Sequence, residues 1–125
     1  MKSKPKRQNP EARLQKAVVA HLMLTATPGV LWFSVPNEGK RSVVMGGHLK
    51  AMGMRPGTAD LILIKKGQAY ALELKAKGKV QSEAQLLFQA DCQTAKTPYC
   101  CSDNIDAALY ALRAWGMIKT KARAA

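Results

Sequence analysis

Residues 57–75 read GTADLILIKKGQAYALELK, and two apolar runs separated by a turn predict a β-hairpin there. The first strand is LILI, which follows Asp60, and the segment KKGQ has the length and the glycine of a hairpin turn. The second strand is AYALELK. Because an antiparallel pair places the start of one strand beside the end of the other, we expect Asp60, Glu73 and Lys75 to converge.

The end of the second strand carries an acid and a base on one side. Strand side chains alternate between faces, so Glu73 and Lys75 point one way while Leu72 and Leu74 point the other. Taken singly, Asp60 could end a turn, and the other two could form an exposed salt bridge of little value to stability. Together they favour a functional patch, since two nearby carboxylates repel each other unless a positive charge lies between them. Lys75 supplies one charge, and Mg²⁺, which binds one or two carboxylates with water and phosphate, is the other natural candidate.

The residues before the hairpin predict a helix, a strand and a long loop. Residues 9–25 begin with an Asn-Pro cap and carry apolar side chains at helical spacing, which predicts a helix. Residues 30–35, VLWFSV, predict a strand. Residues 37–57 predict a loop with a short helix at 48–52, and a loop of this length in a small domain is usually mobile or functional.

The residues after the hairpin predict a helix, a strand and a second helix. Residues 82–95 form the first of these helices, and residues 97–101 a short strand. The last helix begins at Asp103 or Asn104 and ends near Gly116. The face of helix 82–95 that we expect to pack on the sheet comprises Ala84, Leu87, Phe88, Cys92 and Ala95.

The predicted element order is α-β-(loop)-β-β-α-β-α. Three antiparallel strands followed by a helical crossover to a fourth indicate an α/β fold, with a mixed sheet flanked by helices. We expect one domain over residues 9–116, between a flexible basic arm at residues 1–8 and a basic tail at residues 117–125.

The composition points to a polyanionic partner. The chain has 125 residues, with 20 Lys and Arg against 8 Asp and Glu, a formal net charge of +12 and a pI near 10.0. Nucleic acid is the first candidate and an acidic membrane surface the second. Charge that served solubility alone would destabilise the folded chain through self-repulsion, which makes that explanation weaker.

The cysteines and the apolar runs set the expected cellular context. Cys92, Cys100 and Cys101 are odd in number and lack CxxC spacing, so we expect reduced thiols rather than disulfides. A zinc site would need the distant His21 or His48, and we do not expect one. The first residues lack the apolar core of a signal peptide, and no run reaches about eighteen apolar residues. We therefore expect a soluble, intracellular (cytoplasmic) protein.

Two further polar residues are candidates for the same patch. Glu11 lies in the first turn of the first helix, near the apolar stripe that should face the sheet. An acid there stabilises the helix N-terminus, and it could also reach a metal ion, directly or through water. Gln85 closes a capping box, SEAQ, that begins at Ser82. Because that helix follows the Lys75 strand, Gln85 could face the patch instead, or do both.

The run GTAD, followed after twelve residues by ELK, resembles the PD-(D/E)xK nuclease superfamily. The whole chain is more closely similar to the virus-type replication–repair nuclease (VRR-NUC) domain, over roughly residues 9–115. An ExK pair alone is a weak signal, whereas its order relative to the other motifs is more specific. Ala59 departs from the family pattern, which has proline there, and little loss is expected because that residue binds nothing. The matching features are Glu11, PNEGKRS at 36–42, Gly53, GTAD, ELK and SEAQ.

The resemblance implies a restriction-endonuclease-like core and a DNA endonuclease that depends on Mg²⁺ or Mn²⁺. Asp60 and Glu73 would hold the metal with the Leu74 carbonyl, and Lys75 would orient the attacking water or stabilise charge on the phosphate. Glu11 would support the site through metal-bound water, and Gln85 would position Lys75 or a water. The residues that we expect to contact DNA are Asn37, Lys40, Arg41, Lys50, Arg55, Lys77 and Lys79.

The resemblance also implies a substrate and an oligomeric state. Stand-alone VRR-NUC domains resemble dimeric Holliday-junction resolvases, so branched DNA, a four-way junction above all, is the expected partner of a homodimer. Trp32, Phe33, Trp115 and Met117 could form the dimer face, although core packing explains each of them as well. The alternatives are a flap, nicking or restriction-like nuclease, and a non-catalytic nucleic-acid-binding protein with the same fold.

Overall fold

The computed structural model describes residues 9–36 and 43–120, which form four helices and four strands. The order of the elements is the predicted one, with a nine-residue helix, α2, in place of the short predicted one. The elements are α1 (Pro10–Thr25), β1 (Leu31–Ser34), α2 (Val43–Ala51), β2 (Leu61–Lys65), β3 (Gln68–Leu74), α3 (Glu83–Thr94), β4 (Tyr99–Ser102) and α4 (Ile105–Ala114).

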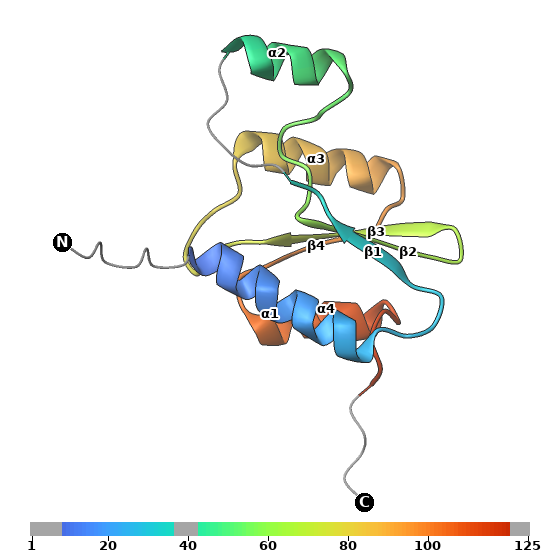
Figure 1. The fold of residues 1–125 in the computed structure, drawn as a ribbon. Coiled ribbons are helices and arrows are strands. Elements are labelled where there is room, and N and C mark those ends of the chain that lie inside the picture. Colours follow the sequence, from blue (N-terminus) through green and yellow to red (C-terminus); the bar gives the residue numbers. More distant parts are fainter. Residues whose placement is uncertain (1–8, 37–42, 121–125) are drawn as a thin grey trace, which may run out of the picture.

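A single mixed sheet organises the described part of the chain. Its strand order is β1-β2-β3-β4, with antiparallel pairs among the first three strands and a parallel pair between β3 and β4. Helices α1 and α4 cover one face of the sheet, α3 covers the other, and α2 lies beyond α3 (Figure 1). The predicted α/β architecture is confirmed.

The central hairpin has the register that places the acids opposite each other. Lys66 and Gly67 both have positive φ, 51° and 79°, as the two central residues of a type I′ hairpin turn require. Leu61 pairs with Leu72. One step further along the same ladder, Asp60 faces Glu73, and directly opposed residues share a face of the sheet. The hairpin prediction from residues 57–75 is therefore confirmed.

The larger part of the core lies between the sheet and helices α1 and α4. It is built from alternate residues of β2 and β3, which meet apolar residues spaced three and four apart on the helices. A smaller cluster of Ala59, Ala71 and Cys92 lies under α3. The largest buried side chains of the main cluster are Val18, Leu22, Leu61, Leu63, Leu72, Leu74, Leu112 and Met117.

Two expectations about the helices were wrong. The loop prediction for residues 37–57 missed most of α2, because Gly46 and Gly47 are poor helix formers and mask the helical pattern. On α3, Leu87 is 59% exposed rather than packed on the sheet, and Ala95 is exposed too. The contact side of α3 is rotated toward Phe88 and Cys92, which pack in the small cluster.

The ordered core extends beyond the predicted domain end at residue 116. Met117 and Ile118, assigned to the basic tail, are buried, and Ile118 forms a β-bridge with Ala26. Both are large apolar side chains that pack in the main core cluster, so burial outweighs their position near a charged segment. Met117 therefore cannot belong to a dimer face, and Trp115 packs its ring against Tyr70. The predicted arm and residues 121–125 lie outside the described residues.

The cysteines are free thiols, with Cys92 buried and Cys101 exposed. None of the helices in the described part of the chain is long and apolar enough to cross a membrane.

Candidate active site

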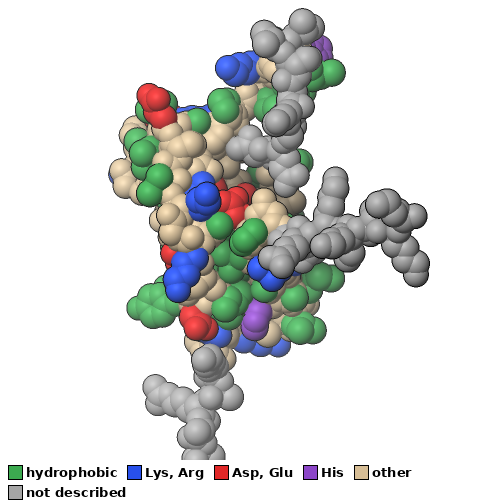
Figure 2. Space-filling model, turned by 90° about the vertical axis from the view of Figure 1, so that its left-hand side faces the viewer, with side chains coloured by type: hydrophobic (Ala, Val, Ile, Leu, Met, Phe, Trp, Pro, Cys, Tyr) green, Lys and Arg blue, Asp and Glu red, His purple; other side chains and the backbone are tan. Residues whose placement is uncertain are grey.

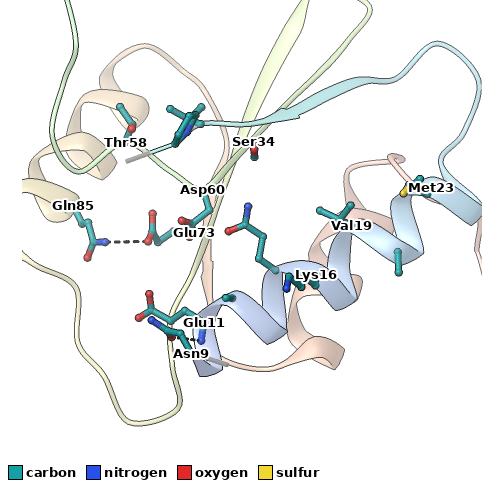
Figure 3. Close-up of a pocket in the computed structure, with 15 residues that line it drawn as sticks. Asn9, Glu11, Lys16, Val19, Met23, Ser34, Thr58, Asp60, Glu73 and Gln85 are labelled. Carbon is teal, nitrogen blue, oxygen red and sulfur yellow. Dashed lines mark hydrogen bonds between the residues drawn. The ribbon is translucent and has the colours of Figure 1, made fainter. Parts of the chain in front are cut away.

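Two carboxyl groups, those of Asp60 and Glu73, form the centre of the site. Glu73 is only 2% exposed, an unusual position for an acid. The backbone N–H of Leu74 donates to Asp60 Oδ2 at 2.7 Å, so the Asp60 side chain folds back over the end of β3. Figure 3 shows the two acids together, with Gln85 on one side and Glu11 below them, and Figure 2 shows acidic side chains in a hollow of this face with basic side chains beside them.

The environment of both acids favours their protonated forms. Burial raises the pKa of Glu73 to about 9, and the negative charge of the neighbouring Asp60 is a further cause. Burial also raises the pKa of Asp60, while the Leu74 N–H and the charge of Lys75 work in the opposite direction. Two adjacent carboxylates, one buried and one half-buried, resist ionising together unless a cation joins them.

Gln85 links the acids to the base. Its Nε2 donates to Glu73 Oε1 at 3.0 Å, and its Oε1 accepts from Lys75 Nζ at 3.2 Å. The same Oε1 accepts from the Ser82 N–H at 2.8 Å, which completes the capping box at the start of α3. The two roles considered for Gln85 therefore occur together, since one amide caps the helix and joins Glu73 to Lys75.

Glu11 reaches the site from the first turn of α1. Its Oε1 accepts from the Ala76 N–H at 3.2 Å and lies 3.9 Å from Lys75 Nζ. Asn9 caps the helix by accepting from the Glu11 N–H at 2.8 Å, which fixes where α1 begins. Lys75 is thus held between an amide oxygen on one side and a carboxylate on the other.

Gly57 allows the loop before Asp60 to press against α3. It has a φ of 77°, and a Cβ at this position would lie 2.4 Å from the carbonyl carbon of Ala84 and 2.7 Å from the N of Gln85. Only glycine permits both the backbone conformation and the approach. The strand that carries Asp60 and the helix that carries Gln85 are held together at this point.

Comparison with solved structures identifies the fold. A comparison with protein-family models found no match, and neither did one with curated proteins. A solved structure titled "VRR_NUC domain protein" aligns with a TM-score of 0.70 at 15% identity, covering 88% of this chain and 90% of that one. The chain has the VRR-NUC fold. Another solved structure, titled "VRR_NUC domain", aligns with a TM-score of 0.58 at 17% identity, and the alignment covers 86% of this chain and 97% of that chain.

On this VRR-NUC fold, the acid pair has the features of a metal-binding site. Glu73 Oε2 is buried and has no hydrogen-bond partner among the described residues. Such an orphaned oxygen is costly unless it is protonated or binds a cation. No group of three or more His, Cys, Asp or Glu within residues 9–36 and 43–120 is arranged to hold a metal. Two carboxylates with water and phosphate suit Mg²⁺, so the residues present fit a hard divalent cation.

The predicted DNA contacts are placed unevenly around the VRR-NUC fold. Lys77 and Lys79 are exposed on the loop that leaves β3, close to Lys75, and Lys50 is exposed in the last turn of α2. Arg55 forms an ion pair with Asp91 and lies over the Phe88 ring, 5.3 Å from its centroid. Asn37, Lys40 and Arg41 lie outside the described residues.

The cavity beside the acids was not predicted from the sequence. The acids open into a cavity of about 860 Å³ that also runs along α1, where Lys16 and Met23 line it, and past Ser34 on β1. The sequence alone gives no signal for it, because the exposure of Met23 is known only from the structure.

Proposed function

We propose that the chain is a DNA endonuclease that hydrolyses phosphodiester bonds with Mg²⁺ or Mn²⁺. The observation that carries this proposal is the buried Glu73, with one oxygen unpartnered among the described residues, its other oxygen bound by Gln85, and Asp60 beside it. Such a site suits a hard cation, and the likeness to VRR_NUC structures makes hydrolysis of nucleic acid the natural chemistry.

Each polar residue has a distinct role in the proposed reaction. Asp60 and Glu73 hold the cation, with the Leu74 carbonyl as a further ligand and Glu11 acting through water. The cation, when bound, lowers the pKa of water and neutralises phosphate charge. Lys75 orients the attacking water or stabilises the negative charge that develops on the phosphate. Gln85 is a positioning residue, because it fixes both Glu73 and Lys75 from the capped end of α3.

DNA is the proposed substrate because the chain has a formal net charge of +12, which attracts a polyanion. This positive charge also offsets the repulsion between the two acids of the site and the phosphate. Lys77 and Lys79 are exposed near the site, where they can bind phosphates without reading bases. We include Lys50 among the residues that contact the phosphate backbone of the DNA. Arg55 would have to leave Asp91 to take part.

A branched substrate and a homodimer complete the proposal. Two symmetric cuts in a four-way junction call for two sites related by a two-fold axis. Phe33, on the edge strand β1, is exposed and available for a dimer contact. A flap or nicking nuclease uses the same site with a different branch, and only a comparison of substrates separates these activities.

The test compares a labelled four-way junction with a linear duplex of the same sequence. Wild type should cut the junction with Mg²⁺ or Mn²⁺ and not in EDTA. Glu73→Gln should lower the rate by about 100-fold or more, because it removes a carboxylate that holds the cation, and the cation activates water and neutralises phosphate charge. Glu83→Gln is the matched control, since Glu83 is an exposed acid in the first turn of α3, beside Gln85, and should behave as wild type.

Two outcomes of the cleavage assay would contradict the proposal, the first its chemistry and the second its substrate preference. If neither cation supports cutting of junction, flap or duplex, while DNA binding persists, the chain is a binding protein with this fold. Equal cutting of junction and duplex would overturn the preference for branches but not the chemistry.

A further inference from the structure

The cavity at the acid pair continues along one side of α1, where nothing in the proposed hydrolysis uses it. Lys16, Val19 and Met23 line this part from the helix, on the side of Ser34 (Figure 3). These helix positions are three and four apart, so they form one stripe. Val18 and Leu22, which pack in the core, form another stripe. We call the side of the cavity that runs from the acid pair and Glu11 past Lys16, Val19 and Ser34 to Met23 the α1 groove.

The α1 groove has the length of a short stretch of DNA strand. Glu11 and Met23 are twelve positions apart, which is about 18 Å along a helix. At the 3.4 Å rise of a stacked strand, this is about five nucleotides. One end of the groove is the acid pair, where the cleaved phosphodiester must lie.

Polar donors stand on both walls of the groove near the acids. Lys16 is an exposed ammonium on the helix wall. On the other wall, the Val35 N–H donates to the Asp60 carbonyl at 2.9 Å, so the antiparallel alternation turns the backbone of Ser34 outward from the sheet. Since β1 is an edge strand, Ser34 offers both a hydroxyl and a backbone N–H. Ammonium, hydroxyl and amide groups are the common ligands of phosphate oxygens.

The far end of the groove is apolar. Met23 is 74% exposed, and Val19 lies beside it on the same stripe. A duplex presents mainly phosphates and sugars to a protein surface and would leave such a wall unused. An unpaired strand exposes the faces of its bases, which bind apolar side chains while its phosphates follow basic residues.

We propose that the α1 groove binds an unpaired DNA strand adjoining the cleaved bond. Its phosphates lie at Lys16 and Ser34, and its sugars and bases lie against Val19 and Met23. This assignment rests on the proposed function, which supplies DNA as the ligand. The substrate is then a branch that carries or opens into single-stranded DNA next to the cut.

A comparison of two neighbouring residues, Met23 and Leu24, tests whether the groove binds an unpaired strand. Met23 and Leu24 are consecutive on α1, are 74% and 82% exposed, and only Met23 lines the groove. Fluorescence anisotropy in EDTA measures the binding of a blunt duplex and of the same duplex with an unpaired extension of about five nucleotides. Met23→Asp should weaken binding of the extended DNA about fivefold more than Leu24→Asp, because its charge lies against the strand. The two variants should bind the blunt duplex equally.

A salt titration gives a second readout on the same DNA. Lys16→Gln should reduce the slope of log K against log salt by about 0.7, the value for one phosphate contact on a single strand. Lys96→Gln, at an exposed lysine just beyond the end of α3, should leave the slope unchanged.

The outcomes separate the groove from the nuclease activity. Equal effects of Met23→Asp and Leu24→Asp on the extended DNA, or a larger effect on blunt duplex, would overturn the groove even if the chain cuts DNA. If Met23→Asp weakens binding of the extended DNA more than Leu24→Asp but the chain cuts no DNA, the groove is supported and the nuclease proposal is overturned. Thermal melting shows that each variant is folded, which both exposed positions permit.

Discussion

At the scale of single residues, the site depends on Glu73, a buried acid whose pKa is raised in the absence of a cation. Alternation along the strand and the hairpin register were enough to predict that Asp60, Glu73 and Lys75 lie together. The burial of Glu73 and its unpartnered oxygen were not predictable, because they depend on how Ala71, Phe88 and α3 close over that face. Lys16 and Ser34 were missed for a related reason, since their positions matter only once α1 lies beside β1.

The raised pKa of Glu73 predicts how stability depends on pH. Between its ordinary value of 4.5 and about 9, the folded chain keeps a proton that the unfolded chain releases. The contribution of protonated Glu73 to the free energy of unfolding is therefore fully present below pH 4.5 and is lost as the pH rises toward 9. In EDTA, the melting temperature of Glu73→Gln, which cannot ionise, should exceed that of wild type by a margin that grows with pH.

Thermal melts at about pH 5, 7 and 9 measure that margin. Mg²⁺ at the highest pH should then stabilise wild type and not Glu73→Gln, because only the carboxylate gains a partner. Glu83→Gln serves as the control for loss of an exposed acid. A margin that stays constant across the three pH values would show that Glu73 titrates normally in the folded chain.

At the scale of elements, the start of α3 holds the site together. Ser82, Gln85 and the following turn were predicted as a capping box, and the structure has both of its hydrogen bonds. The length of α2 and the rotation of α3 were not predictable from periodicity. Two glycines obscured the length of α2, and on α3 the exposed Leu87 falls at the helical spacing of a buried face.

Gly57→Ala should separate α3 from the acid pair. The new Cβ would meet the backbone of Ala84 and Gln85, so the first turn must shift and Gln85 must leave Glu73 or Lys75. We expect a loss of about 1–3 kcal/mol in unfolding free energy beyond the control, and a clear fall in the cleavage rate.

The control for this variant is Gly29→Ala. Gly29 also has a positive φ, 85°, but open space surrounds its Cβ position, so it reports the backbone strain alone. Denaturant unfolding and the junction assay compare the two. Equal losses of stability and activity in both variants would mean that the contact with α3 has no role of its own.

At the scale of the whole molecule, the sheet order and the helix layers follow from the order of elements in the sequence. A hairpin pairs its own strands, and a helical crossover makes the next strand parallel, so few topologies remained. The end of the folded region was harder to predict. Lys65 Nζ donates to the Gly116 carbonyl at 2.8 Å and to Thr27 Oγ1 at 3.0 Å, and these tertiary contacts draw the following residues into the core.

A chain that ends after Thr120 should therefore be far more stable than one that ends after Gly116. The shorter chain lacks Met117 and Ile118, whose burial contributes about 2 kcal/mol each. Urea unfolding of the two chains measures the difference. Similar midpoints would show that these two residues do not contribute to the fold.

The two-residue turn at Lys66 and Gly67 has a consequence for how such a site can change over evolution. Asp60 and Glu73 are opposed only because equal numbers of residues separate each of them from the turn. One added residue in either strand would move an acid to the other face of the sheet, whereas one added to both strands near the turn would leave the pair opposed. Functional descendants that keep this turn should therefore keep an even number of residues between their two acids, twelve in this chain, however long the hairpin becomes.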